Sequence, residues 1–190
     1  MNLNTIFFIG PQGSGKGTQA RILAERLDFY NWEMGGILRE VSKEDSELGQ
    51  QIKNMIDNGI LLPDPLLFKV IESRLSQIDA RRGIIFDGVP RRVGQAEFLM
   101  SFLQNHGRKN FTTFFIDLPK EESLQRLLRR AQKENRPDDT AEVIQKRLEQ
   151  YYEATVPVVE YLKQRTNFIE VDGGSSVETV TKNINETLNL

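Results

Sequence analysis

Residues 10–19, GPQGSGKGTQ, lie between an apolar run and an apolar-periodic stretch, and their spacing indicates phosphate binding. They nearly match the pattern G-x-x-x-x-G-K-[ST], in which glycines let backbone N–H groups turn toward a phosphate that a lysine also reaches. Gly15 and Lys16 fit the pattern, but Gly17 comes next and Thr18 is one position late. Because the hydroxyl that would hold magnesium is displaced, the segment is either a broken nucleotide site or a variant with different chemistry.

A second residue that could do chemistry is Asp87, at the end of the apolar run GIIFD. Magnesium retains water strongly and often takes most of its other ligands from substrate phosphates, so a nearby carboxylate can hold it through water. We favour Asp87 for that role. A strand-end aspartate can equally cap the following turn, and this alternative stays open.

Six arginines form a set that suits polyanions: Arg39, Arg91, Arg126, Arg130, Arg136 and Arg147. A planar guanidinium binds phosphate bidentately and stays charged, so such groups offset the repulsion between two nucleotides. Arg126 and Arg130 are four residues apart and share one helix face. A run such as RLLRRAQKENR is also typical of a solvated helix face, but the phosphate loop in the same chain favours the functional interpretation.

The composition is that of an ordinary globular domain, with 190 residues, 38% hydrophobic and 27% charged. A net charge of −2 gives no support for binding nucleic acid or a membrane surface, and the absence of cysteine excludes disulfides and thiolate zinc sites. No apolar run approaches the roughly 18 residues of a membrane span, and MNLNTIFFIG lacks a signal-peptide pattern. We expect a cytoplasmic enzyme without nucleic-acid or membrane partners.

The elements that must position these residues alternate along the chain. Apolar runs predict buried strands at 5–9, 83–87, 112–118 and 167–171, and a weaker one at 29–32. Periodic segments predict helices at 16–27, 64–77, 94–107, 121–135, 140–165 and 177–190. Asp64 is the expected N-cap of the second helix, and Gly107 the expected C-cap of the third. This alternation predicts an α/β fold with a doubly wound, parallel five-stranded sheet and helices on both faces, whose ligands bind at the carboxyl ends of the strands.

Two segments, GPQGSGKGTQA at 10–20 and FDGVPRRVGQAE at 86–97, resemble the adenylate kinase family of nucleoside monophosphate kinases. That family reads G-x-P-G-x-G-K-G-T-Q and D-G-F-P-R-x-x-x-Q-A, so Gly17 matches the family's own version of the loop. GGILRE at 35–40, with 48–67, is similar to its monophosphate-binding subdomain, and 126–139 with 146–162 to its lid and returning helix. The resemblance runs along nearly the whole chain.

The resemblance implies one kinase domain over 1–190. Its P-loop-containing core would comprise 1–32, 65–130 and 140–190, with a monophosphate-binding subdomain at about 33–64 and a short lid at about 131–139. The implied reaction is reversible transfer of the γ-phosphoryl group from Mg-ATP to AMP by a monomer. The alternatives are a kinase for UMP/CMP or another nucleoside monophosphate, and a degenerate nucleotide-binding protein without phosphotransfer.

The resemblance also implies a role for individual residues. The ATP-binding set is Gly13, Ser14, Gly15, Lys16, Gly17, Thr18, Arg126, Arg130 and Gly173. The catalytic set is Lys16, Arg91, Arg130, Arg136 and Arg147, with Asp87 holding Mg²⁺ through water. The acceptor-binding set is Met34, Gly35, Arg39, Ile60, Leu61, Leu62, Gly88, Val89, Pro90, Arg91, Gln95, Arg136 and Arg147. Within these sets, Arg126 would cover the donor base and Arg130 would reach the outer phosphates.

Several assignments keep a structural alternative. Gln95 matches the family glutamine that contacts the acceptor base, but it could be a solvated residue at a helix start. Asp139 could contact ribose or arginine, or cap the next helix. We expect Trp32 to serve packing and His106 to lie on the surface.

Three positions depart from the family pattern. Met34 replaces a threonine that contacts adenine, Gly36 replaces the aspartate of G-D-x-L-R, and Val89 replaces the phenylalanine of D-G-F-P-R. Methionine offers a polarizable apolar surface to a base but cannot make the hydrogen bond of threonine. AMP remains the favoured acceptor because Gln95 and the surrounding framework are kept.

Overall fold

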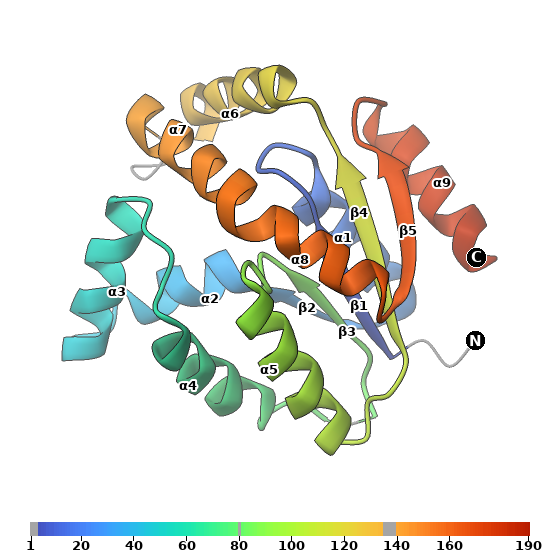
Figure 1. The fold of residues 1–190 in the computed structure, drawn as a ribbon, viewed down its shortest axis with the longest axis horizontal. Coiled ribbons are helices and arrows are strands. Elements are labelled where there is room, and N and C mark those ends of the chain that lie inside the picture. Colours follow the sequence, from blue (N-terminus) through green and yellow to red (C-terminus); the bar gives the residue numbers. More distant parts are fainter. Residues whose placement is uncertain (1–3, 80, 135–139) are drawn as a thin grey trace.

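The computed structural model describes residues 4–79, 81–134 and 140–190 (Figure 1). One sheet of parallel strands has the order β2-β3-β1-β4-β5. The strands are β1 (Thr5–Ile9), β2 (Tyr30–Glu33), β3 (Ile84–Asp87), β4 (Phe111–Asp117) and β5 (Asn167–Asp172). The doubly wound parallel sheet predicted from the sequence is confirmed, and every strand boundary lies within one residue of its predicted position.

Helices cover both faces of the sheet (Figure 1). Phe7 of β1 packs in a core with α4 (Asp64–Leu75), α5 (Val93–Asn105) and α8 (Val156–Lys163). Ile6 and Phe8, which point to the opposite face, pack with α1 (Lys16–Leu27) and α9 (Val177–Leu188). Because successive strand residues alternate between two buried faces, the strands read as continuous apolar runs.

The predicted helix over 140–165 is divided in the structure. It consists of α7 (Ala141–Gln150), a π-helical turn η1 (Tyr151–Thr155) and α8, and the Val156 N–H donates to the Tyr151 carbonyl five residues back. Pro157 follows this turn, and a proline has no N–H and crowds the carbonyl four residues before it. The wider turn accommodates this proline within a continuous helical path.

Two helices, α2 (Met34–Val41) and α3 (Glu47–Asp57), lie in 33–64, where we predict no element from the sequence. The remaining helix, α6 (Lys120–Glu134), leads out of β4 and agrees with the predicted 121–135. The loops after β1, β2 and β3 all leave from the carboxyl edge of the sheet, as the parallel strands require.

The two predicted helix caps have different outcomes: the N-cap prediction at Asp64 is wrong, and the helix-ending glycine at position 107 is confirmed. Asp64 is the first residue of α4 and Pro63 its N-cap, because the Asp64 carboxylate is bound by Arg92 instead. Gly107 ends α5 as predicted: it directly follows the C-cap residue His106 with φ +80°, and its N–H donates to the Gln104 carbonyl.

Candidate active site

The phosphate loop between β1 and α1 is shaped by glycines. Gly13 has φ +86°, and a Cβ there would lie 3.0 Å from the Ser123 backbone oxygen, so only glycine allows this approach. Gly15 precedes α1 with φ +92°, and a Cβ there would meet no atom of the described chain within 4 Å. The start of α1 is therefore accessible, and its N–H groups and helix dipole favour an anion there.

Lys16 is the first residue of α1, and its ammonium nitrogen lies close to the loop. Nζ donates to the Pro11 carbonyl at 3.1 Å. Burial lowers the pKa of Lys16 to about 8, an effect that the Asp87 carboxylate opposes and that Arg91 and Arg130 increase. A bound phosphate would counter these effects because it favours the charged form of the lysine.

Asp87 ends β3, which is the direct neighbour of β1, so its carboxylate lies beside the loop. Its Oδ1 is buried and has no hydrogen-bond partner in the described part of the chain, so this atom caps no turn there. Its Oδ2 would lie only 2.9 Å from a Cβ on Gly17. Burial raises the pKa of Asp87 and Lys16 and Arg91 lower it, while the carboxylate of Glu33 also raises it.

Arg91 lies in the loop after β3 and is held by hydrogen bonds on three sides. Its Nε donates to the Gly88 carbonyl at 2.9 Å, and its backbone N–H donates to Gln95 Oε1 at 2.8 Å. Its own carbonyl accepts from Thr155 Oγ1 at 3.1 Å, in the π-helical turn. The backbone of Arg91 is therefore fixed between α5 and η1.

Charges from four elements act on one another around Asp87. Burial lowers the pKa of Arg91, Asp87 opposes this, and Arg147 of α7 lowers it further. In the same way, the charge of Arg130 on α6 lowers the pKa of Lys16. Lys16 and Arg91 thus act on Asp87 directly, while Arg130 and Arg147 act on these two cations. Such a group of cations suits a polyanion, whose charge would relieve their mutual repulsion.

One part of the predicted acceptor set lies on α2 and on the connection from α3 to α4, and its other described members follow β3 or lie on α5 and α7. Arg39 Nη2 is 2.8 Å from Glu33 Oε1 in a half-exposed ion pair. Met34 is buried, and its sulfur accepts from Trp32 Nε1 at 3.5 Å. Trp32 is fully buried in the core, so its predicted packing role is confirmed.

Gln95 is buried, so the alternative of a solvated glutamine is wrong. Its Nε2 donates to Asp64 Oδ1 at 2.8 Å. His106 is exposed, as predicted, and stacks on Phe102 with ring centroids 4.2 Å apart. The N-cap of α7 is Thr140, which accepts from the Val143 N–H.

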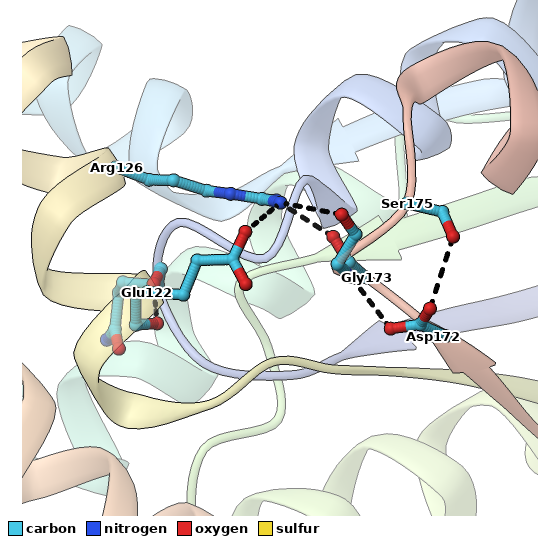
Figure 2. Close-up of polar contacts among 8 residues, drawn as sticks. Glu122, Arg126, Asp172, Gly173 and Ser175 are labelled. Atoms are coloured by element: carbon cyan, nitrogen blue, oxygen red, sulfur yellow. Dashed lines mark hydrogen bonds and ion pairs between the residues drawn. The ribbon is translucent and has the colours of Figure 1, made fainter.

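Arg126, predicted to cover the donor base, bridges α6 and the turn after β5 (Figure 2). Its guanidinium donates to Glu122 Oε1, to the Gly173 carbonyl at 2.9 Å and to the Gly174 carbonyl at 3.4 Å. The Gly173 N–H donates to the Asp117 carbonyl at 2.8 Å. Both backbone groups of Gly173 are therefore engaged within the protein.

Most of the predicted residues line one cleft of about 510 Å³. The predicted residues in its wall are Gly13, Gly15, Lys16, Gly17, Thr18, Met34, Gly35, Arg39, Ile60, Leu61, Leu62, Asp87, Gly88, Arg91, Gln95, Arg126, Arg130 and Arg147. Ser14, Val89 and Pro90 are buried behind the wall, and Gly173 lies outside it. Arg136 and Asp139 lie outside the described residues.

Comparison with known proteins finds relatives along nearly the whole chain. The family model of adenylate kinase matches residues 8–167. Adenylate kinase 1 of a Nostoc species is 41% identical over 186 residues, which is 98% of this chain and 99% of that protein. The adenylate kinases of Phocaeicola vulgatus and Thermus thermophilus are 36% and 37% identical, over 96% and 97% of both chains. This chain belongs to the adenylate kinase family.

As a member of the adenylate kinase family, the protein is a phosphotransferase.

The departure from the family pattern at Gly36 is accompanied by a carboxylate from a neighbouring residue. A Cβ on Gly36 would lie 3.4 Å from the Glu33 carboxyl carbon. The carboxylate of Glu33, reaching from the end of β2, thus occupies the space beside position 36. An acidic group is retained at this place, although it comes from a different residue.

The family's phosphoryl chemistry uses magnesium, and the donors in this chain fit it. Asp87 offers a carboxylate oxygen without a protein partner, and the missing side chain of Gly17 leaves room beside it. No group of three or more histidine, aspartate or glutamate side chains in the described residues could hold a metal by itself. One carboxylate with water and phosphate ligands is a common arrangement for Mg²⁺.

No helix in the described ranges is long and apolar enough to cross a membrane.

Further residues line the cleft that our sequence analysis does not assign to it: Gln12, Arg21, Asn31, Glu33, Leu38, Ile56, Gly59, Leu67 and Leu127. The carboxyl-end rule could have indicated Glu33, because it ends β2 beside Asp87 in register. Gln12 lies within the phosphate loop itself. The apolar members have no local signal, because only the packing of α2, α3, α4 and α6 brings them to the cleft.

Gly17 gives the first testable prediction. We expect Gly17→Ala to lower kcat by about 10- to 100-fold, because its Cβ would displace the Asp87 carboxylate by a fraction of an ångström or more. The control is Gly94→Ala in the first turn of α5, where the nearest atom to the new Cβ is 3.7 Å away. Steady-state rates with both substrates saturating measure the effect. Equal rates for the two variants would contradict it.

Proposed function

We propose that this chain reversibly transfers the γ-phosphoryl group of Mg-ATP to AMP and so produces two ADP. The observation that carries this proposal is a group of four interacting cations in one cleft beside a phosphate loop: Lys16 and Arg91 next to Asp87, with Arg130 and Arg147 acting on them. Two nucleotides that face each other require such a concentration of positive charge. Relatives named adenylate kinase over nearly the whole chain support the choice of substrates.

For the donor, we propose that the loop N–H groups and Lys16 bind the β- and γ-phosphates. Arg130 reaches the outer phosphates from α6, and Arg126 covers the adenine beside the turn at Gly173. Arg126 donates to two carbonyls of this turn, which supports the assignment because these contacts hold the guanidinium against the turn.

For the acceptor, we propose that Arg39 and Arg91 grip the monophosphate and that Gln95 contacts the base. The apolar wall of the base pocket comes from Met34 and from 60–62. The sulfur of Met34 is bound to Trp32, so its side chain has a fixed position and offers the base a polarizable surface. Arg147 then reaches toward the transferred group. We assign the same role to Arg136 from the family resemblance alone.

The chemistry requires no protein nucleophile. Phosphoryl transfer depends on alignment of the reacting oxygens and on compensation of their charge in a dry site. Mg²⁺, when bound, neutralises charge on the β- and γ-phosphates, and Asp87 would hold it through water. We further propose that 33–64 and 131–139 close over the substrates, and that their reopening limits turnover.

We also propose that the enzyme acts as a monomer in the cytoplasm, which the family resemblance supports. Sedimentation at micromolar concentration and cell fractionation test these two points. A dimer or a membrane-bound fraction would contradict them without affecting the proposed reaction.

A coupled assay tests the reaction itself. The purified chain is incubated with Mg-ATP and, separately, AMP, GMP, UMP or CMP, and formation of diphosphate is followed. We expect AMP to give the highest kcat/KM by at least about 100-fold, because a site that pairs the polar groups of one base rejects bases that leave them unpaired. Highest activity with UMP or CMP would contradict the choice of acceptor. ATP binding without transfer to any monophosphate would reject the kinase activity.

A further inference from the structure

The side-chain amide of Gln95 is hydrogen-bonded at both ends within the protein. Its Oε1 accepts from the Arg91 backbone N–H at 2.8 Å, and its Nε2 donates to Asp64 Oδ1 at 2.8 Å. Gln95 is 2% exposed and lines the cleft, so water does not compete freely for these bonds. The amide is therefore held in one of its two orientations, with the nitrogen toward α4 and the oxygen toward the loop after β3. We call this orientation the amide sense of Gln95.

Rotating this amide by half a turn is unfavourable at both ends. The rotation would place the amide oxygen against the Asp64 carboxylate, which can only accept hydrogen bonds when ionised. It would also place the NH₂ group against the Arg91 N–H, which can only donate. Solvent relieves neither mismatch, because Gln95 is buried. A buried polar group without a hydrogen-bond partner is costly. Asp64 and Arg91 together thus select one of the two orientations that an isolated glutamine can adopt.

A second contact holds Asp64 in place. Its Oδ1 also accepts from Arg92 Nη1 at 2.9 Å, and the same nitrogen donates to the Leu62 carbonyl at 2.9 Å. Arg92 is donor-only, so it supports Asp64 as an acceptor. This contact explains why Asp64 does not cap α4. It also connects the amide of Gln95 to the backbone beside the apolar wall at Leu62.

After these two bonds, the amide retains one N–H and one oxygen lone pair. We propose that Asp64 is a specificity-determining residue that fixes the amide sense of Gln95 and thereby selects adenine over a 6-oxopurine as acceptor base. This inference rests on the proposed function. Adenine presents an acceptor, N1, beside an exocyclic amino donor. Hypoxanthine presents N1–H beside an oxygen and needs the opposite amide sense, which Asp64 excludes.

AMP and IMP differ at this edge of the base, so they are the matched pair of acceptors for the test. Asp64→Asn keeps the size of the side chain but can turn an NH₂ group toward Gln95, so that only the Arg91 N–H still opposes the reversed amide. We expect the ratio of kcat/KM for AMP to that for IMP to fall at least about tenfold, because a paired polar edge accounts for strong discrimination. The kcat at saturating AMP should change much less, because Asp64 does not contact the phosphates.

Two further variants separate the amide sense from a general loss of structure. Asp57→Asn removes one partner of the exposed Lys53–Asp57 ion pair at the end of α3, and it should leave the ratio unchanged. Arg92→Met removes the support of Asp64 but leaves its bond to Gln95. It should therefore raise KM for both monophosphates and keep their ratio.

The outcomes distinguish this inference from the proposed function. If the unmodified enzyme phosphorylates AMP and Asp64→Asn leaves the AMP to IMP ratio within twofold, Asp64 does not determine the specificity. If the unmodified enzyme does not phosphorylate AMP, the proposed function and this inference both fail. Urea unfolding checks that each variant is folded. Asp64→Ala, which has no acceptor for Gln95, should lower the same ratio and replaces the asparagine variant if that protein is unstable.

Discussion

Lys16→Ala should lower kcat by about 1,000-fold, equivalent to about 4 kcal/mol of transition-state stabilisation. The ammonium lies beside the loop and close to Asp87, where it would bind the oxygens that gain charge as the phosphoryl group moves. The fold should persist, because burial already disfavours the charged form of this lysine and its ammonium donates locally, to the Pro11 carbonyl of the same loop. Steady-state kinetics and urea unfolding measure the two quantities.

The pH dependence of ATP binding provides an independent check on Lys16. In the free protein its pKa is about 8, well below the ordinary 10.5 of a lysine, so the ammonium is lost as pH rises through 8. Bound phosphate favours the charged form, so binding above this pH takes up a proton. The apparent Kd for ATP should rise about tenfold between pH 7 and pH 9. Lys16→Arg, whose side chain stays charged, should bind without this slope, and a flat profile for the unmodified protein would contradict the prediction.

The second large effect is expected for Arg91→Ala, which should lower kcat by about 1,000-fold and raise KM for the acceptor. Its guanidinium is fixed by the Gly88 carbonyl and by a backbone held at both ends, so it is already positioned before the substrates bind. Such preorganised charge needs no rearrangement during the reaction. Arg91→Lys should recover only a small part of the rate, because an ammonium lacks the bidentate fork.

A matched control for Arg91 is Arg82→Ala, which removes an arginine from the exposed ion pair with Asp28, away from the cleft. Exposed pairs contribute about 0–1 kcal/mol, so this variant should keep the activity and nearly all of the stability. Isothermal titration with AMP measures the loss of acceptor binding directly. Unchanged kcat and AMP affinity in Arg91→Ala would show that the group does not contact the reacting phosphates.

Local signals in the sequence predict the parts of this protein that depend on neighbours along the chain. The glycine spacing at 10–17 predicts the phosphate loop because backbone conformation there is a local property. Apolar runs predict the five strands because both faces of a parallel sheet are buried. Local capping rules are less reliable, as Asp64 shows, since a tertiary partner such as Arg92 can take the same carboxylate.

The sequence by itself determined the fold class, the phosphate loop and most of the cations that line the cleft, but not Arg21 or the carboxylate of Glu33. Only the tertiary structure decided that Glu33 fills the space beside Gly36, that the amide of Gln95 is bonded at both ends, and that Arg147 acts on Arg91. Each of these contacts joins residues on different elements. Their distance and orientation depend on how helices pack on the sheet, and no periodicity along a single element carries that information.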